Sequence, residues 1–245
     1  MTATVTMIKH PLEDYVWVFV GCGGTFYAAS PYLAVLCKRC GCTAPLLIDP
    51  DQVTLDNQDR QWAGYGSPYS KVEAAEEVLG IGEDATLIVD RFNPVDSVLC
   101  RHTEGKPVIA IVNVDNNAAR LEVARWLSDR VSDGIMIVSG CERAFGQCYP
   151  GIWKDGEPVY DWRAHHSDVV QDSSSSSDNP CNAQDVRANA LTGVLVGMCI
   201  EDIARRMSDG DWVNVAEFYW DLRHPSESLS MWITLASCKE RSPVL

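Results

Sequence analysis

Residues 15–26, YVWVFVGCGGTF, constrain the fold of this chain more than any other stretch. The first six are apolar, and they are β-branched or aromatic, which predicts a central strand covered on both faces. Gly21, Gly23 and Gly24 follow at once, and glycines let a backbone turn tightly and approach a ligand closely. A helix expected over 25–38 would direct its free N–H groups and positive dipole end at an anion such as a phosphate. The stretch therefore predicts a nucleotide site at the carboxyl edge of a parallel sheet.

Strand and helix patterns alternate along the chain up to Gly140. The further strands expected in this part cover residues 44–48, 85–90, 107–113 and 134–139, and the helices cover 71–79 and 118–131. Gly41 is expected to end the first helix, and Pro31 is compatible with that helix only in its first turns or at a kink. This alternation predicts an α/β fold with a doubly wound, Rossmann-like, mostly parallel sheet.

The pattern changes after Gly140. Residues 151–162 predict a hairpin with Asp155 and Gly156 at its turn, and residues 168–179, which contain SSSSS, predict a solvated loop. A long helix over 182–206 and two strands, 213–222 and 229–235, complete the expected elements, with the strands pairing as antiparallel edge strands. The expected organisation is a single domain over 1–245, with a nucleotide-binding core over 15–140 and the hairpin, loop, helix and edge strands over 141–245.

Composition excludes some classes of partner. The formal net charge of −14 leaves no basic surface for a long phosphate backbone, so we expect neither nucleic acid nor an anionic membrane as a partner. No run of about 18 apolar residues is present, and the N-terminus has no signal-peptide pattern, so a cytoplasmic location is expected. A small nucleotide stays compatible with this charge because a helix terminus and a few cations suffice to bind it.

The ten cysteines are expected to be reduced thiols. Their main cluster is Cys37, Cys40 and Cys42 in CKRCGC. A thiolate zinc site usually takes four ligands, commonly from two CxxC pairs, and the sequence offers no second pair. Buried or helix-end thiols are the simpler reading of this cluster.

Four polar residues follow expected strands or flank the loop beyond the second strand. Asp49 stands where an acidic side chain after the second strand meets ribose hydroxyls. Arg60 and Lys71 flank a polar loop and are suited to phosphate oxygens, while Asp115 follows the fourth strand and is suited to Mg²⁺. Each also has a structural reading: a turn former for Asp49, solvated cations for Arg60 and Lys71, and a helix N-cap for Asp115.

The order of these motifs resembles the ThiF/MoeB-type family, the bacterial relatives of ubiquitin-activating enzymes. That family has a glycine turn, an acidic strand end leading to an S-N-L-x-R-Q loop, a lysine, and a D-N-x-x-x-R helix start. Here the loop reads DNQDRQ, which keeps Asn57, Arg60 and Gln61, and the helix start runs from Asp115 to Arg120. The Ser-rich loop before a cysteine and a long helix also resembles ThiF-like proteins of plasmid (PRTRC-type) and phage systems.

The resemblance implies an adenylation enzyme that uses ATP and Mg²⁺ and works as a homodimer. It implies nucleotide contacts from one set of residues: Gly21, Gly23, Gly24, Asp49, Asn57, Arg60, Gln61 and Lys71. Asp115 would hold Mg²⁺. The implied substrate is the C-terminal carboxylate of a ubiquitin-like or sulfur-carrier protein or of a peptide.

The family also passes the acyl group, in some members, to a cysteine on a crossover loop. Cys181 in DNPCNAQDV has the position for such an acceptor at a helix start, although Asp172, Asp178 and Asp185 nearby oppose a thiolate. The alternative is a structural cysteine.

Three departures from the family pattern leave other functions open. Phe26 stands where many members have a third glycine, and its ring either narrows the nucleotide pocket or points into the helix–sheet contact. In the family, an arginine near the N-terminus often reaches across a homodimer to the γ-phosphate bound by the partner, but residues 1–15 contain no arginine, so Lys9 or His10 would have to take that role. The paired CxxC motif of several members is also missing. A non-enzymatic binding or scaffold module and a dinucleotide-dependent oxidoreductase are therefore the alternatives to the adenylating enzyme.

Overall fold

The computed structural model of the protein describes residues 10–42, 44–54, 70–80, 84–142, 144–167, 169, 186–211, 214–223 and 229–237. Its strands belong to one nine-stranded sheet: β1 (Val16–Val20), β2 (Leu46–Ile48), β3 (Thr86–Ile88), β4 (Val108–Val112), β5 (Gly134–Cys141), β6 (Phe145–Lys154), β7 (Glu157–Tyr160), β8 (Asn214–Asp221) and β9 (Ser230–Ser237). Its α-helices are α1 (Gly24–Arg39), α2 (Lys71–Leu79), α3 (Ser97–Thr103), α4 (Asn117–Arg130) and α6 (Val186–Asp209), and residues Trp162–Ala164 form a short 3₁₀ helix.

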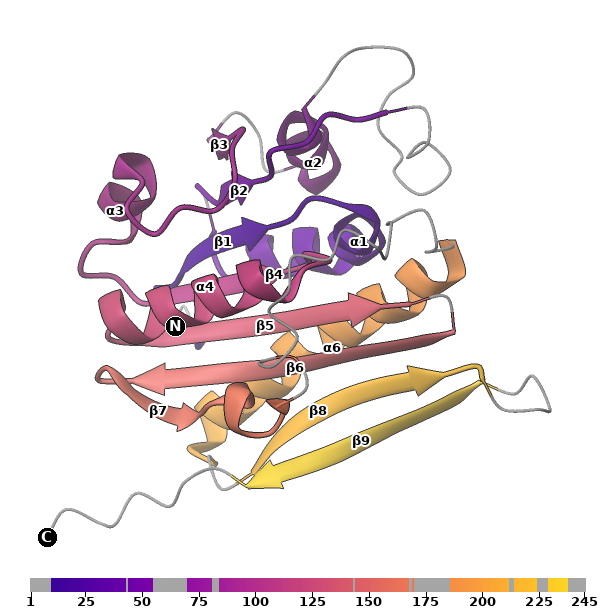
Figure 1. Cartoon of the computed structure of the whole chain (residues 1–245). Helices are drawn as coiled ribbons and strands as arrows, with labels where there is room; N and C mark the ends of the chain where they lie inside the picture. Colours follow the sequence, from indigo (N-terminus) through magenta and orange to yellow (C-terminus); the bar gives the residue numbers. More distant parts are fainter. Residues whose placement is uncertain are drawn as a thin grey trace, which may run out of the picture.

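The sheet has the order β3-β2-β1-β4-β5-β6-β8-β9 (Figure 1). The five strands from β3 to β5 are mutually parallel, and β6, β8 and β9 continue the sheet in antiparallel pairs. β7 forms a hairpin with β6 and shares the outer edge of β6 with β8. The predicted α/β class with C-terminal antiparallel edge strands is confirmed. The strand order reverses between β1 and β4, and open α/β sheets bind their ligands at such a reversal.

Helices cover both faces of the sheet (Figure 1). Side chains of α1, α2 and α6 pack with Trp17 and Phe19 of β1 on one face, and side chains of α3 and α4 pack with Val18 and Val20 on the other. Successive residues of a strand point to opposite faces, which explains why an uninterrupted apolar run is needed to fill both cores. No helix among the described residues is both long enough and apolar enough to cross a bilayer.

The C-terminal elements agree with the sequence in type, and their bounds differ from the expected ones by a few residues. The hairpin turn lies at Asp155 and Gly156, both with positive φ, as a type I′ turn requires. The strand before it, β6, begins six residues earlier than expected and pairs along its length with β5. Helix α3 has no counterpart among the expected elements, because its seven residues are too few to display a helical period and bury only Leu99 and Thr103.

Helix α1 continues through Pro31, in its third turn. A proline there has no N–H for the carbonyl of Tyr27 four residues earlier. The hydroxyl of Ser30 donates to that carbonyl instead, at 2.7 Å. Phe26, one turn before, is fully buried and packs edge-to-face against Phe19 with ring centroids 5.5 Å apart, so its ring lies in the helix–sheet contact.

A buried carboxylate ties β8 to the segment after β7. Glu217 accepts hydrogen bonds from the hydroxyls of Tyr160 and Tyr219, the latter at 2.6 Å, and its Oε1 lies 3.0 Å from Nε2 of His166. Burial alone raises the pKa of Glu217, but the hydrogen bonds from His166, Tyr160 and Tyr219 outweigh it and lower the pKa to about 2.

We predict that Glu217→Gln destabilises the protein at pH 7 by about 1–3 kcal/mol and that this loss shrinks in acid. The folded pKa lies below the ordinary value of 4.5, so the stabilisation is present above pH 4.5 and is lost as the pH falls through about 2. Urea unfolding at pH 7 and pH 3 measures both effects. Glu157→Gln, on the exposed part of β7, is the control; a loss at Glu217 that does not change with pH would contradict the role of its charge.

We also predict that Gly193→Ala lowers the free energy of unfolding by about 1–3 kcal/mol. Gly193 lies where α6 crosses α1, and a Cβ there would come within 2.6 Å of the backbone carbon of Ala28. Gly197→Ala, one turn further along the same helix, is the matched control because its Cβ would meet only the exposed side chain of Tyr32, at 3.2 Å. Equal shifts of the urea midpoint in the two variants would show that close helix packing is not the cause.

Candidate functional site

The glycine turn follows β1 at the carboxyl edge of the parallel strands. Gly21 has φ +86°, and a Cβ there would lie 2.8 Å from the carbonyl oxygen of Asn113, at the end of β4. Its N–H donates to the carbonyl of Ile48 at 2.9 Å. Gly21 is therefore required by the packing of three neighbouring strand ends, whichever molecule binds beside it.

Helix α1 begins directly after the turn. Gly23 is its N-cap and has no side chain to cap the first-turn N–H groups, and Gly24 is its first residue. A Cβ on Gly24 would lie 2.5 Å from Nδ2 of Asn189 in α6, so this glycine allows α6 to approach the start of α1. The positive end of a 16-residue helix, with first-turn donors that no side chain caps, lies at the point where the strand order reverses.

Asp49 lies at the end of β2 and is almost completely buried. Its Oδ2 accepts from the N–H of Cys22 at 2.7 Å and its Oδ1 accepts from the N–H of Asp51 at 2.9 Å. Burial raises the pKa of Asp49, while Lys71 and the two N–H donors act in the opposite direction. The predicted ribose ligand thus lies against the glycine turn, where its carboxylate also holds the turn in place.

Lys71 is the first residue of α2, after the N-cap Ser70, which forms a capping box with Glu73. Its ammonium lies 2.6 Å from Oδ2 of Asp51, and only 12% of its side chain is exposed. Because Lys71 also affects the pKa of Asp49 and Cys22, its charge acts on the glycine turn. The structure therefore brings the predicted phosphate ligand to the same edge.

Asp115 is exposed and follows β4, whose Val112 pairs with Val20 of β1. The N-cap of α4 is Asn116, which accepts from the N–H of Ala119 at 2.8 Å, so the capping reading of Asp115 is wrong. Asp115 thus lies just before the N-cap of α4, in the segment that leaves β4 beside the end of β1.

Arg120 joins the segment after β4 to β5. The sequence marks it as the arginine of the D-N-x-x-x-R motif and assigns it no role of its own. Its guanidinium is buried and donates through Nη2 to the carbonyls of Val114 and Ser139, at 2.9 and 3.0 Å, and through Nη1 to Asn117, at 2.9 Å. It thereby ties the segment that carries Asp115 to β5 and α4. The position of Arg120 five residues after Asp115 in D-N-x-x-x-R was the available signal.

Four further residues of the predicted site lie outside the described residues: Asn57, Arg60, Gln61 and Cys181. No group of three or more His, Cys, Asp or Glu side chains suited to a metal ion occurs within the described part of the chain. A single exposed carboxylate such as Asp115 is compatible with Mg²⁺, which commonly uses one or two carboxylates together with substrate phosphates and water.

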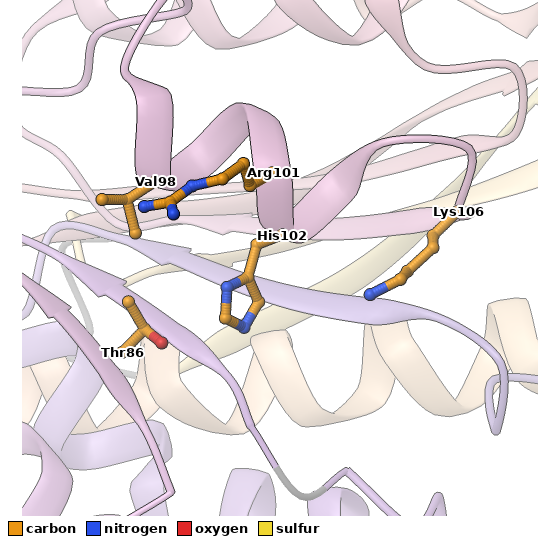
Figure 2. Close-up of a pocket in the computed structure, with 5 residues that line it drawn as sticks. All are labelled: Thr86, Val98, Arg101, His102 and Lys106. Carbon is orange, nitrogen blue, oxygen red and sulfur yellow. The ribbon is translucent and has the colours of Figure 1, made fainter.

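A separate surface pocket lies at the opposite edge of the sheet. Figure 2 shows its lining residues between α3, the start of β3 and the segment before β4: Thr86, Val98, Arg101, His102 and Lys106. Arg101 and His102 belong to the last turn of α3, where cations complement the negative helix end. This pocket contains none of the predicted site residues.

We predict that Arg120→Met destabilises the protein by about 1–3 kcal/mol, because two carbonyls at the strand ends lose their donor. Chemical denaturation measures the change. Arg125→Met is the matched control, since Arg125 lies on the exposed face of the same helix. If Arg125→Met costs as much as Arg120→Met, the contacts of Arg120 with the strand ends are not what stabilises this edge.

Known structures share this fold. No protein-family model and no curated protein sequence matches the chain. Among solved structures, PaaA matches with a TM-score of 0.60 and 16% identity, over 93% of this chain and 74% of PaaA. Escherichia coli MccB in complex with AMPCPP and MccA matches with a TM-score of 0.57 and 18% identity, over 96% of this chain and 67% of MccB. MccB in complex with ATP matches with a TM-score of 0.55 and 16% identity. At the level of the fold, the chain is similar to PaaA and MccB, with the Rossmann-like arrangement of parallel strands described above.

Proposed function

We propose that the protein adenylates a carboxylate with ATP, namely the C-terminal carboxylate of a peptide or of a ubiquitin-like or sulfur-carrier protein. One observation carries the proposal: the uncapped start of α1, the ammonium of Lys71 and the carboxylate of Asp115 all lie at the carboxyl edge around β1. A helix N-terminus and a cation suit phosphate oxygens, and a carboxylate beside them suits the metal ion that accompanies a triphosphate.

Several residues of the chain have roles in this proposal. The first-turn N–H groups of α1 and Lys71 bind phosphate oxygens, and Lys71 exchanges its present partner Asp51 for them. Asp49 holds the glycine turn and faces the ribose, while Asp115 holds Mg²⁺. Asn57, Arg60 and Gln61 are further proposed phosphate contacts, on the resemblance alone.

The chemistry needs positioning and charge more than it needs a protein base. The incoming carboxylate is ionised at neutral pH, so its oxygen attacks the α-phosphorus without losing a proton. Cations and helix N–H groups reduce the repulsion between this carboxylate and the triphosphate, and they stabilise the charge that develops as pyrophosphate leaves. Mg²⁺, when bound, supplies part of that charge compensation.

The proposed substrate class is supported by one of the fold relatives. MccB has been solved with ATP and with its partner MccA, and this chain spans about two thirds of MccB. A peptide carboxylate is therefore the first substrate to test. Action as one domain and as a homodimer in the cytoplasm also belongs to this proposal and rests on the resemblance and on composition.

We predict that the protein catalyses ATP–pyrophosphate exchange in the presence of a substrate peptide or carrier. Asp115→Asn and Lys71→Met should each reduce the rate of exchange about 100-fold or more, because each substitution removes a charge that stabilises the transition state. The assay measures exchange of labelled pyrophosphate into ATP over a panel of peptides and of carriers ending in Gly-Gly. The matched controls are Asp129→Asn in α4 and Lys38→Met in α1, both exposed and remote from the turn.

The same preparation separates the alternative functions. A protein that binds ATP but shows no exchange with any carrier would support a binding or scaffold module. Bound NAD in the purified protein would support the oxidoreductase. Exchange that is unchanged in Asp115→Asn would refute the metal role of Asp115.

A further inference from the structure

The surface pocket at the amino edge of the sheet has no part in the proposed adenylation. It encloses about 410 Å³ between α3, the start of β3 and the segment before β4 (Figure 2). That volume is within the range found for small-molecule sites. Since β3 is the end strand of the sheet, the pocket lies beside an open sheet edge, where a ligand can enter from solvent.

Three of the five side chains that line the pocket carry nitrogen donors, and none is a carboxylate. The three are Arg101, His102 and Lys106, and the other two are Thr86 and Val98. This lining contrasts with the chain as a whole, which has 34 Asp and Glu against 20 Lys and Arg. The pocket is therefore a locally basic site on an acidic protein, and an anion there is attracted by several donors at once.

The nitrogen donors of the pocket are not engaged in ion pairs within the described part of the chain. Arg101 donates through Nε to the carbonyl of Ser97, one turn earlier, at 3.1 Å, which leaves the N–H groups of both Nη atoms for a ligand. Glu104, the acidic residue nearest in sequence to His102 and Lys106, is exposed and does not line the pocket. An anion would therefore meet cations that no carboxylate has neutralised.

The end of α3 accounts for these cations only in part. Cations near a helix C-terminus complement its negative end, but the last carbonyls of α3 already have other donors. The carbonyl of Cys100 accepts from the N–H of Glu104 at 3.0 Å, and the carbonyl of Thr103 accepts from the N–H of Lys106 at 3.1 Å. The carbonyl of Leu99 accepts from the hydroxyl of Thr103 at 2.8 Å. These carbonyls thus leave the cationic groups of the pocket available.

The donors come from three separate segments and face a shared space. Figure 2 shows the ring of His102 between the hydroxyl of Thr86 and the ammonium of Lys106, with the guanidinium of Arg101 near Val98. A phosphate monoester offers three oxygens and close to two negative charges at pH 7, which suits these donors better than a carboxylate with two oxygens and one charge. The pocket also has room for an organic group beside the phosphate.

We propose that this pocket binds a small organic phosphate monoester, with Arg101, His102 and Lys106 contacting the phosphate oxygens and Val98 contacting the organic group. The pocket is separate from the proposed adenylation site. It lies where β3 and β4 begin, whereas the glycine turn lies where the parallel strand β1 ends. Binding here is therefore independent of adenylation and is measured without ATP.

Titration with glycerol 3-phosphate, followed by the NMR signals of the histidine rings, tests the proposal. The chain has five histidines, and His102→Gln identifies the signal of His102. We expect a saturable shift of that signal at constant ionic strength. Arg101→Gln and Lys106→Gln should each raise the apparent Kd at least about fivefold, because each removes a charged donor. Arg91→Gln and Lys38→Gln, which remove exposed charges outside the pocket, are the matched controls and should leave the Kd unchanged.

The proposal is overturned if no saturable shift occurs up to about 10 mM ligand, or if Arg101→Gln and Lys106→Gln both keep the Kd of the parent. Tighter binding of malonate than of glycerol 3-phosphate would equally reject a phosphate site. Circular dichroism of each variant identifies a change that comes from unfolding.

Lys71→Met separates this pocket from the adenylation site. We expect this variant to retain the shift at His102, and loss of the shift would assign the binding to the glycine turn and reject the pocket. A parent protein that shows the shift but no pyrophosphate exchange would keep the pocket and reject only the adenylation.

Discussion

The hydrogen bond from the N–H of Cys22 to the carboxylate of Asp49 is the contact on which the rest of the site depends. It joins the turn after β1 to the end of β2 inside the protein. Burying a carboxylate there costs free energy unless hydrogen-bond donors surround it. Two further contacts continue the series across the sheet: Gly21 packs on the backbone of Asn113, and Arg120 joins the ends of β4 and β5. Four consecutive strand ends are thus held in register by polar and backbone contacts, which fixes the direction in which α1 points.

Much of the fold follows from local sequence. The apolar run of β1 and the helical spacing of α2 gave element bounds within one residue of those in the structure, because propensity and tertiary burial agree there. Helix α3 was not predicted because its seven residues are too few to show a helical period. The early start of β6 was not predicted because its first residues are held by pairing with β5, across a turn, and with β8, which is far away in sequence. The contacts of Arg120 could not be predicted from its place in the D-N-x-x-x-R motif, since two of its acceptors are backbone carbonyls, one just after β4 and one in β5.

Buried donors without acceptors gather at the same edge. Among the described residues they include Nδ2 of Asn113, Nε of Arg120 and Nδ2 of Asn189. Folded proteins rarely leave such groups unpaired, and where they do, water, an ion or a functional role usually accounts for them. The formal charge of −14 is no obstacle to an anionic ligand here, because fixed N–H groups and the ammonium of Lys71 set the local field while the acidic side chains are screened by solvent.

The hydroxyl of Ser30 has a consequence beyond helix α1 itself. It takes the place of the N–H that Pro31 lacks, so neither residue can be judged alone. Replacing Ser30 by alanine would strand the Tyr27 carbonyl, whereas replacing Pro31 as well would restore a backbone donor and make the hydroxyl dispensable. The dependence therefore runs one way: the hydroxyl of Ser30 is needed only while Pro31 is present, whereas replacing Pro31 alone leaves the Tyr27 carbonyl with a donor.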